Sequence, residues 1–411
     1  FIRFSTRIER ARWDESHARW EVVANGGEVI RARAVVAGVG TFGRPKLPDV
    51  PGLSAFEGPV LHSAKWDHSV SLAGKRVAVI GTGASAIQIV PEASKVASQV
   101  VVYQRTPAWI PPKQDRPIGD RERALYAAVP MAQTLHRLGI YWQNELLGAT
   151  AFLHSARLRR LGEAECKKNL RRHIKDPVLR EKLTPKYEIG CKRVLPSNLF
   201  YPALARPNVS LVAAALDRVE GKTLFGADGS VHEVDVVVCA TGFDIVDEPV
   251  PFELTGRRGV DLRKLWATRA EAYLGTTISG FPNLFLVTGP NTGLGTTSMI
   301  FMMESQFAYI VDAMKTMHRE HLRWVDVRPE VQVEFNAEMQ RRAEGTTWMS
   351  GCKSWYLNRE GKNVGLWPSY TFEYRWRTRR FDLGRYQRAY EAPVFAPREV
   401  TRRAPAAIAP A

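Results

Sequence analysis

The first forty residues follow a strand pattern that is broken by turn residues. Residues 1–6 have the composition of a strand, and two further strand segments, 19–23 and 29–36, flank the turn Asn25-Gly26-Gly27. An Asn-Gly pair between two such segments predicts a β-hairpin, because both residues tolerate positive φ. Residues 44–52 contain three prolines and can sustain neither helix nor strand. We expect them to cross between two domains.

Residues 74–105 have the order strand, glycine-rich turn, helix, strand. The apolar run 75–80 leads into the turn, helical spacing extends over 87–97, and a second apolar strand covers 99–103. That order is one unit of a doubly wound parallel sheet. The chain is therefore predicted to be an α/β protein.

A helical region interrupts the strand pattern between residues 116 and 186. Strand signals are missing there, and apolar side chains recur at helical spacing, as in Met131, Leu135, Leu138, Trp142 and Leu146. We interpret the region as a helical insertion. The alternative is that its amphipathic faces simply pack on the neighbouring sheet, as most such helices do.

Strands return after the helical region. They are predicted at 209–213, 234–239 and 284–288, and the last leads through the loop 289–295 into a helix from Ser298 to about Met317. Residues 392–411 are rich in Pro, Ala and Arg, which predicts a loose tail. No internal repeat is visible, which excludes stacked-repeat folds.

The composition is that of a globular protein, with 45% hydrophobic and 24% charged residues in 411. This length predicts two or three domains, and no apolar run approaches the roughly eighteen residues of a membrane helix. The net charge of +16 favours anionic partners. A phosphorylated cofactor is a more economical partner than nucleic acid, because no nucleic-acid-binding motif accompanies the basic run 374–380. Since a strand pattern begins at Phe1, we expect the true start to lie upstream.

The four cysteines are far apart in the sequence, at Cys166, Cys191, Cys239 and Cys352. None belongs to a Cys-x-x-Cys pair, which argues against a zinc site and against a redox-active disulfide. So few thiols in a chain of this length fit a reducing compartment. We expect a cytoplasmic protein without a metal and without persistent disulfides.

The glycine-rich turn reads Gly81-Thr82-Gly83-Ala84-Ser85-Ala86, a G-x-G-x-x-A pattern. The first glycine permits a tight turn, the second lets backbone amides approach a pyrophosphate, and the alanine lets the helix pack closely. The helix N-terminus adds partial positive charge. Its place between two predicted strands makes this pattern specific for a dinucleotide site.

The end of the following strand distinguishes NADP from NAD. NAD-specific sites usually carry an acidic residue there for the ribose hydroxyl, whereas this chain has Gln104 and Arg105. A guanidinium can pair bidentately with a phosphate. We infer that the cofactor is NADP(H), with Arg105 on its extra phosphate; the alternative is an ordinary surface arginine.

Residues 56–67 contain a string of fixed positions, F-x-G-x-x-x-H-x-x-x-W-D, made by Phe56, Gly58, His62, Trp66 and Asp67. This string resembles the fingerprint of Baeyer–Villiger monooxygenases and their close flavin-monooxygenase relatives. Further segments resemble that family in the same order, over about residues 3–386: 190–193, 240–243, 289–293 and 353–356.

The resemblance implies two dinucleotide-binding Rossmann-like domains with a helical insertion. The family's first G-x-G-x-x-G, which holds FAD, is absent here, so the FAD-binding domain would be incomplete at its N-terminus. The implied domains are part of the FAD-binding domain at 1–55, a linker at 56–73, the NADP-binding domain at 74–115 and 187–240, the insertion at 116–186, a return to the FAD-binding domain with a cofactor-covering loop at 241–391, and the tail at 392–411.

The resemblance also implies roles for single residues. Arg193 would be the active-site arginine, and Lys192 would bind phosphate beside Arg105. Trp355 would cover the nicotinamide ribose, or else be a plain core aromatic. His62 and Trp66 would hold or relay domain movement. Further cofactor contacts are expected from Thr241, Gly242, Gly38, Gly40, Asn291 and Gly293.

The implied activity is oxygen insertion. NADPH would reduce FAD, reduced flavin would add O2, and the resulting peroxyflavin would attack a ketone to give an ester or lactone. Arg193 would stabilise the developing negative charge, since a guanidinium cannot deprotonate. Two alternatives stay open, namely an N- or S-oxygenating flavin monooxygenase and a non-catalytic NADP(H)-binding fragment. The sequence specifies neither the small-molecule substrate nor the oligomeric state.

Overall fold

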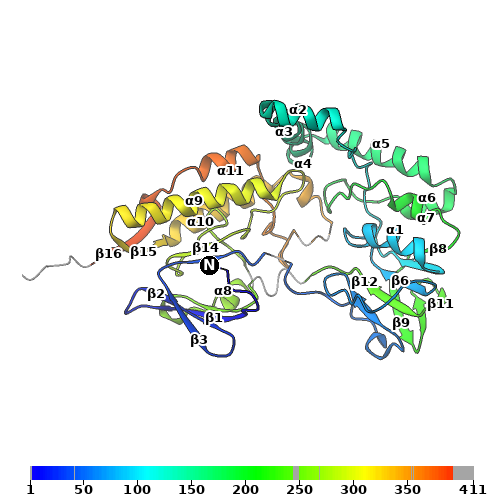
Figure 1. Ribbon diagram of the computed structural model, residues 1–411, viewed down its shortest axis with the longest axis horizontal. Helices are drawn as coiled ribbons and strands as arrows, with labels where there is room; N and C mark the ends of the chain where they lie inside the picture. The colour runs from blue at the N-terminus through cyan, green and yellow to red at the C-terminus, as the bar shows by residue number, and fades with distance from the viewer. Residues whose placement is uncertain are drawn as a thin grey trace, which may run out of the picture.

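The computed structural model describes residues 2–40, 42–243, 250–267, 269–352, 354 and 356–391. These residues form two lobes, and a group of helices extends along the upper side of the molecule in the view of Figure 1. None of the described helices is long and apolar enough to cross a membrane.

The lobe that includes the predicted unit at residues 74–105 contains a parallel sheet. Its strand order is β5 (Val60–His62), β12 (Val236–Cys239), β6 (Arg76–Ile80), β7 (Gln99–Tyr103) and β8 (Val209–Val212). Helix α1 (Ala86–Val96) connects β6 to β7, and α7 (Phe200–Leu204) precedes β8. A small antiparallel sheet of β9 (Leu216–Glu220), β10 (Thr223–Gly226) and β11 (Val231–Glu233) adjoins it. The predicted strand–turn–helix–strand unit is confirmed.

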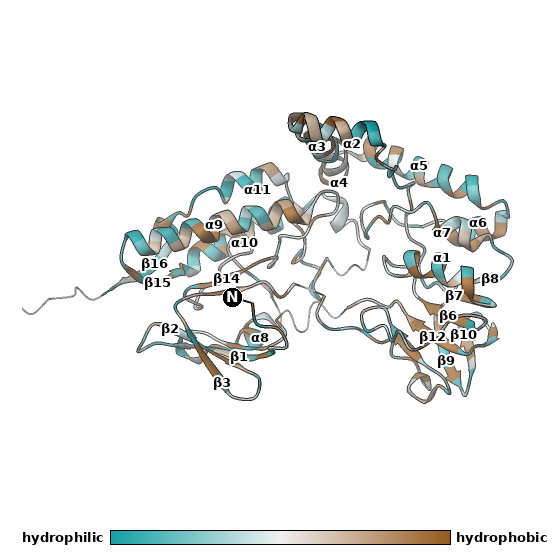
Figure 2. Ribbon diagram, in the orientation of Figure 1, coloured by the Kyte–Doolittle hydropathy of each residue, from teal (hydrophilic) through white to brown (hydrophobic). Residues whose placement is uncertain are grey.

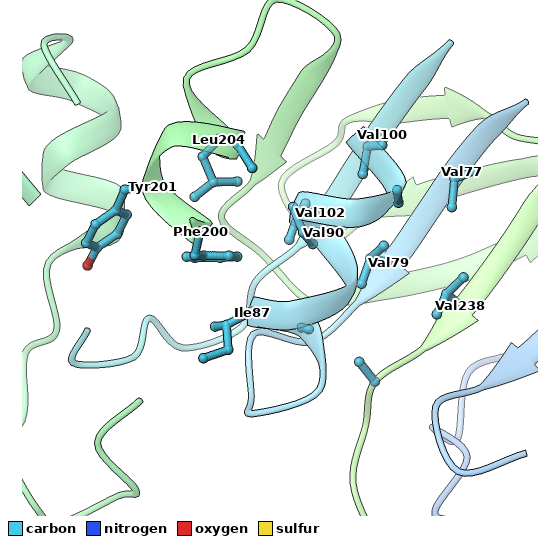
Figure 3. Packing of buried hydrophobic residues seen from close by; sticks show 14 of the residues in the cluster. Val77, Val79, Ile87, Val90, Val100, Val102, Phe200, Tyr201, Leu204 and Val238 are labelled. Atoms are coloured by element: carbon cyan, nitrogen blue, oxygen red, sulfur yellow. The ribbon is translucent and has the colours of Figure 1, made fainter. Parts of the chain in front are cut away.

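The core of this lobe lies between the sheet and α1. Val79 and Val102 are fully buried on the strands, and Ile87 and Val90 of α1 face them, with Phe200 beyond (Figure 3). Figure 2 shows hydrophobic colouring along β6, β7 and β12. Burying a Val or Ile side chain contributes about 1.5–3 kcal/mol, so these contacts fix the start of α1 relative to the ends of the strands.

The other lobe carries several smaller sheets. One has the order β13 (Glu253–Thr255), β1 (Ile8–Asp14), β2 (Arg19–Ala24) and β3 (Glu28–Ala32), and two strand pairs are β14 (Leu284–Leu286) with β4 (Val35–Ala37) and β15 (Leu322–Val327) with β16 (Tyr386–Tyr390). The helices of this lobe are α8 (Leu262–Trp266), α9 (Met299–Arg319), α10 (Pro329–Ala343) and α11 (Thr371–Arg377). The predicted helix after Ser298 is confirmed.

Three strand predictions need correction. Within residues 2–6 the structure has no strand, and β1 begins only at Ile8. The segment 29–36 is not one strand. The Val35 amide donates to the Asn283 carbonyl, and the Asn283 side chain donates to the Arg33 carbonyl. Because of these bonds the chain leaves the hairpin there and enters another sheet as β4. The strand at 284–288 ends at Leu286, since Thr288 adopts a φ of 61°.

The helical insertion is confirmed as helical. It comprises α2 (Asp120–Ala128), α3 (Pro130–Gln143), a π-helical turn Asn144–Ala149, α4 (Thr150–Leu153), α5 (Ala156–His173) and α6 (Pro177–Leu183). Its apolar stripe does not pack on the neighbouring sheet, because Met131, Leu135, Leu138, Trp142 and Leu146 are 43–63% exposed. The alternative of simple packing on the sheet is therefore wrong for α3.

The cysteines depart from the expectation of free thiols. Cys191 and Cys352 form a disulfide, although 161 positions separate them in the sequence. Cys166 and Cys239 are free and buried. No sequence pattern predicts the pair, since only the packing of two distant loops brings these thiols together.

Candidate active site

The glycine-rich turn has the geometry of a pyrophosphate site. Gly81 adopts a φ of 109°, and a Cβ there would lie 2.6 Å from the Ala240 carbonyl oxygen, so the turn requires glycine. Gly83 faces open space, and no side chain caps the start of α1 at Ser85. The Thr82 hydroxyl donates to the Thr106 carbonyl at 2.9 Å and holds the turn. A helix start that no side chain of the described residues caps fits an anionic ligand.

Two cations lie near this turn. Arg105 is exposed, and the Lys192 ammonium lies 5.2 Å from the centre of the Tyr187 ring. Burial lowers the pKa of Lys192, and the positive charge of Arg105 lowers it further. Across the described residues, no carboxylate is paired with either side chain. Two neighbouring cations without an acid fit the extra phosphate of NADP.

The F-x-G-x-x-x-H-x-x-x-W-D residues surround β5. Phe56 is in the core, and a Cβ on Gly58 would lie 2.6 Å from the Asp235 carbonyl oxygen. Trp66 packs partly buried against the sheet core, and the carboxylate of Asp67 accepts from the Ser69 hydroxyl, which lowers the pKa of Asp67. Part of the segment interpreted as a linker is thus the edge strand of the parallel sheet, paired with β12.

His62 ends β5, and its ring lies against one of the segments that pass between the lobes. Its ring contacts Phe243 edge-on at 5.9 Å, and Phe243 in turn contacts Phe42 at 5.2 Å. Burial lowers the pKa of His62, and the Gly242 backbone opposes this. The Ala64 amide donates to its Nδ1 atom at 3.1 Å, and its Nε2 atom is buried without a hydrogen-bond partner among the described residues. The imidazole is therefore a neutral packing group between the crossing segments at neutral pH.

The two crossing segments are bonded to each other. The Lys46 amide donates to the Gly242 carbonyl at 2.9 Å, and the Thr241 hydroxyl donates to the Lys46 carbonyl. Residues 240–243 follow the end of β12, and Phe243 forms an isolated bridge with Pro45. Thr241 and Gly242 thus lie at the junction of the lobes.

A cavity of about 720 Å³ lies where the lobes and the insertion meet. Its walls come from segments of both lobes and of the insertion: Ala37, Val39, Gly40 and Phe42, the start of α1, residues 193–196, residues 286–290 and 292–297, the π-helical turn with α4, and Asn358, Val364 and Gly365. This volume is within the usual range of about 300–1,000 Å³ for small-molecule sites. Apolar side chains such as Phe152, Trp266 and Leu286 form much of the lining.

Arg193 places a positive charge in the wall of this cavity. Its side chain is exposed and lines the wall, and in the described part of the chain it has no carboxylate partner. Burial raises the pKa of the neighbouring Tyr356 to about 12, and the charge of Arg193 opposes that rise. A permanent cation is thus available to an oxygen anion inside a largely apolar space.

The predicted site residues do not all meet at this cavity. Gly40, Ala84, Arg193 and Gly293 line it, whereas Gly38 is exposed beside it. The Asn291 side chain is buried and donates to the carbonyls of Asn363 and Leu366 at 2.9 and 3.2 Å, so it supports the 363–366 loop. Trp355 lies outside the described residues.

The comparisons with known proteins agree with this site. Residues 1–117 match the flavin-binding monooxygenase-like family. A Baeyer–Villiger monooxygenase of Streptomyces coelicolor is 45% identical over 395 residues, which cover 96% of this chain and 76% of the relative. A Baeyer–Villiger monooxygenase of Pseudomonas aeruginosa is 43% identical, with 93% and 73% covered. The chain belongs to the Baeyer–Villiger monooxygenase family.

Solved structures of similar monooxygenases have the same fold. The closed crystal structure of cyclohexanone monooxygenase superposes with a TM-score of 0.82 at 26% identity, and covers 95% of this chain and 81% of that one. A steroid monooxygenase bound to NADP superposes with a TM-score of 0.80 at 28% identity, with 92% and 78% covered. The predicted α/β class with two dinucleotide-binding domains is confirmed.

The insertion supplies cavity residues that the sequence did not predict. Asn144 and Gly148 from the π-helical turn and Phe152 from α4 line the cavity, and the Phe152 ring packs against Gly190 and Gly295. In sequence these residues belong to an ordinary amphipathic pattern. A π-helical turn inside a helix often marks a functional site. No residue pattern in the sequence predicts the π-helical turn here.

Proposed function

We propose that this chain is an NADPH- and FAD-dependent monooxygenase that inserts one oxygen atom of O2 into a small ketone and gives an ester or lactone. The proposal rests on the position of Arg193. Its guanidinium lies in the wall of an apolar cavity between two nucleotide-binding lobes, and it has no carboxylate partner in the described residues. Relatives named Baeyer–Villiger monooxygenase support it at 43–45% identity.

The glycine-rich turn would hold the NADP(H) pyrophosphate. Backbone amides of residues 81–86 and the start of α1 would face the phosphates, and Arg105 with Lys192 would bind the extra phosphate. The steroid monooxygenase with a similar fold is bound to NADP. Bound there, NADPH supplies a hydride.

The walls at residues 37–40 and 289–297 would hold the flavin. Thr297 lines the cavity, and its hydroxyl oxygen is buried without a hydrogen-bond partner among the described residues. OTEMO, which superposes with a TM-score of 0.83, was solved as a complex with FAD and NADP. Bound FAD supplies the electron transfer and the activation of O2.

Arg193 would act on the substrate oxygen. Its guanidinium would donate hydrogen bonds to the carbonyl oxygen as negative charge develops there, and an apolar wall of Phe152, Trp266 and Leu286 would exclude water and strengthen this interaction. The residue cannot lose its proton at working pH, so it would not quench the anion by proton transfer.

The remaining assignments support this activity. His62 and Trp66 would stabilise the junction of the lobes, and Trp355 would cover the nicotinamide ribose. A cytoplasmic location stays part of the proposal, but the cysteines no longer support it, since two of the four form a disulfide.

Isotope labelling tests the proposal. The purified chain, supplied with FAD, NADPH and an apolar cyclic ketone under ¹⁸O2, should release a lactone that carries one ¹⁸O atom. A sulfoxide from a thioether with no lactone from the ketone would favour heteroatom oxygenation instead. NADPH binding without any oxygenated product would identify a non-catalytic NADP(H)-binding protein.

A further inference from the structure

A group of exposed apolar side chains lies on the helices of the insertion and of the neighbouring lobe. These side chains come from α3 with its π-helical turn, from α9 and from α11, which lie near one another on the upper side of the molecule (Figure 1). They are 38–63% exposed: Met131, Leu135, Leu138, Trp142, Leu146, Ile300, Phe307, Val311, Met314, Phe372 and Trp376. We call them the helical face.

Contacts between the helices make the helical face continuous. The Trp142 ring of α3 contacts the Phe372 ring of α11, with 5.9 Å between the ring centres. On α9, Glu304 lies on the exposed stripe, and its carboxylate pairs with Arg375 of α11 at 3.9 Å. A continuous exposed apolar surface of this kind marks an interaction site, whereas single exposed apolar residues are normal.

The exposed stripe of α9 is separate from the core. Its members Ile300, Phe307, Val311 and Met314 are spaced seven, four and three residues apart, which puts them on one side of the helix. The opposite side of α9 is buried in the core of its lobe. Folding of the described residues therefore uses one side of α9 and leaves the other apolar side in the solvent.

The charge on these helices is mostly positive. Across the described residues of α3, α9 and α11, Glu304 is the only exposed acidic side chain. Exposed basic side chains lie on the same helices or directly after α11: Arg137, Lys315, Arg319, Arg375 and Arg379. The helical face thus combines apolar area with positive charge, which fits a partner that is apolar in part and negatively charged.

Two of these arginines lie on aromatic rings. The guanidinium of Arg375 is 4.6 Å from the centre of the Phe301 ring, and that of Arg379 is 4.8 Å from the centre of the Trp376 ring. The arginine stem covers apolar area in this arrangement, while the charged head stays available to an anion. Aromatic and basic groups side by side are typical of helices that lie in the headgroup layer of a membrane.

A second copy of this chain is the less favourable partner. Each copy has a net charge of +16, so pairing two helical faces would bring like charges together. An anionic phospholipid surface has negative headgroups above an apolar layer, and each Lys or Arg near it adds attraction. Charge complementarity therefore favours lipid.

We propose that the helical face binds the surface of a membrane that contains anionic phospholipid, with its apolar side chains at the acyl boundary and its arginines at the phosphates. This inference does not depend on the proposed oxygenation. Leu146 of the π-helical turn belongs to the face, so attachment brings that turn, which also lines the cavity, to the lipid.

Vesicle sedimentation tests the inference. The full chain is mixed with vesicles of phosphatidylcholine and phosphatidylserine in equal parts, or with vesicles of phosphatidylcholine alone. The partition coefficient should be at least about tenfold higher on the mixed vesicles, because each nearby basic side chain adds a gain of about fivefold. Added salt should weaken this binding, since it screens the attraction.

Paired substitutions separate the two contributions. Leu135→Gln together with Trp376→Gln removes apolar contact and should lower the partition coefficient about tenfold or more. Arg375→Gln together with Arg379→Gln should lower it roughly twentyfold, and on the mixed vesicles only. These four side chains are exposed, so thermal unfolding should match that of the wild type.

Matched controls lie on the other lobe. Val231→Gln and Lys222→Gln change exposed apolar and basic side chains of the small antiparallel sheet and its turn, and both should bind vesicles like the wild type. No binding, equal binding to the two kinds of vesicle, or equal binding by face variants and controls would overturn the inference and leave the proposed function intact. A dimer in analytical ultracentrifugation that Leu135→Gln with Trp376→Gln converts to a monomer would place a second copy on the face and would overturn it as well.

Discussion

Arg193 shows how one residue type fits one chemical task. Burial makes a lysine easier to deprotonate, and it lowers the pKa of the neighbouring Lys192. An arginine keeps its charge and offers several N–H donors in a fixed plane. In the proposed reaction, a permanent cation is needed beside an oxygen that becomes negative.

Replacing this cation should separate cofactor use from oxygen insertion. Arg193→Ala should lower the rate of product formation by about 10²–10³-fold, the usual cost of removing one donor to a developing oxyanion, while NADPH oxidation continues. Product yield per NADPH consumed is the measurement. Arg137→Ala, an exposed arginine on α3, serves as control and should behave like wild type. Normal yield from Arg193→Ala would refute the assigned role.

Asp326 should make the stability of the fold depend on pH. Burial raises the pKa of this carboxyl to about 7, although hydrogen bonds from the Gly280 amide and the charge of Arg257 oppose the rise. A raised folded-state pKa means that the native state holds the proton more tightly than the unfolded chain, so this contribution is fully present below about pH 4 and is lost as pH rises to about 7.

The corresponding measurement is urea unfolding across pH. From pH 5 to 7, the Asp326 contribution to the unfolding free energy should fall by up to about 1.4 kcal/mol per pH unit. Asp326→Asn keeps an acceptor for the Gly280 amide and should remove this part of the slope. An unchanged slope in that variant would show that Asp326 ionises normally.

At the scale of elements, a π-helical turn docks the insertion on the other lobe. Glu145 in this turn is fully buried, and its carboxylate accepts from the Thr371 amide at 3.0 Å and the Thr371 hydroxyl at 2.7 Å. Tyr141 bonds the same hydroxyl, and Thr150 bonds Tyr370. The turn that carries Glu145 also supplies Asn144 and Gly148 to the cavity.

Loss of this docking should affect substrate binding more than chemistry. Glu145→Ala leaves the Thr371 donors unsatisfied, which costs about 1–3 kcal/mol of stability, and should raise the KM for ketone while kcat changes little. Glu145→Gln keeps one acceptor and should be intermediate. Steady-state kinetics with thermal unfolding test this, and Glu165→Gln, at an exposed position on α5, is the control. A KM unchanged in Glu145→Ala would exclude the positioning role.

At the scale of the whole molecule, the positive charge is unevenly distributed. The chain has a net charge of +16, and residues 116–186 alone carry fifteen Lys and Arg against seven Asp and Glu. The cations at Arg105, Lys192 and Arg193 add to this field without an acidic partner in the described residues. Such a field attracts anionic ligands and weakens as salt increases.

Salt should therefore discriminate between the two nicotinamide cofactors. Raising NaCl from 50 to 500 mM, concentrations chosen for roughly a threefold change in Debye length, should weaken NADP⁺ binding more than NAD⁺ binding, because NADP⁺ carries the extra phosphate. Arg105→Ala should remove most of this difference. Binding isotherms for both cofactors provide the test, and an identical salt dependence for both would contradict the assignment of Arg105.

Local patterns predicted the parts of the site that are local in the chain. The turn at Gly81–Ala86, the strands on either side and the cation after β7 depend on steric rules within about thirty residues, and the structure confirms that unit. The split of residues 29–36 could not be predicted, because Asn283, some 250 positions away, redirects the backbone.

The sequence by itself determined the α/β class, the dinucleotide turn, the helical character of the insertion and the candidate arginine, since periodicity and glycine sterics act over short distances. Only the tertiary structure decided which residues share the cavity, that Asn291 supports a loop, that α3 exposes its apolar stripe and that Cys191 meets Cys352. Asn291 bonds residues 72 and 75 positions away, and Cys191 meets a cysteine 161 positions away; no local pattern encodes contacts between segments so far apart.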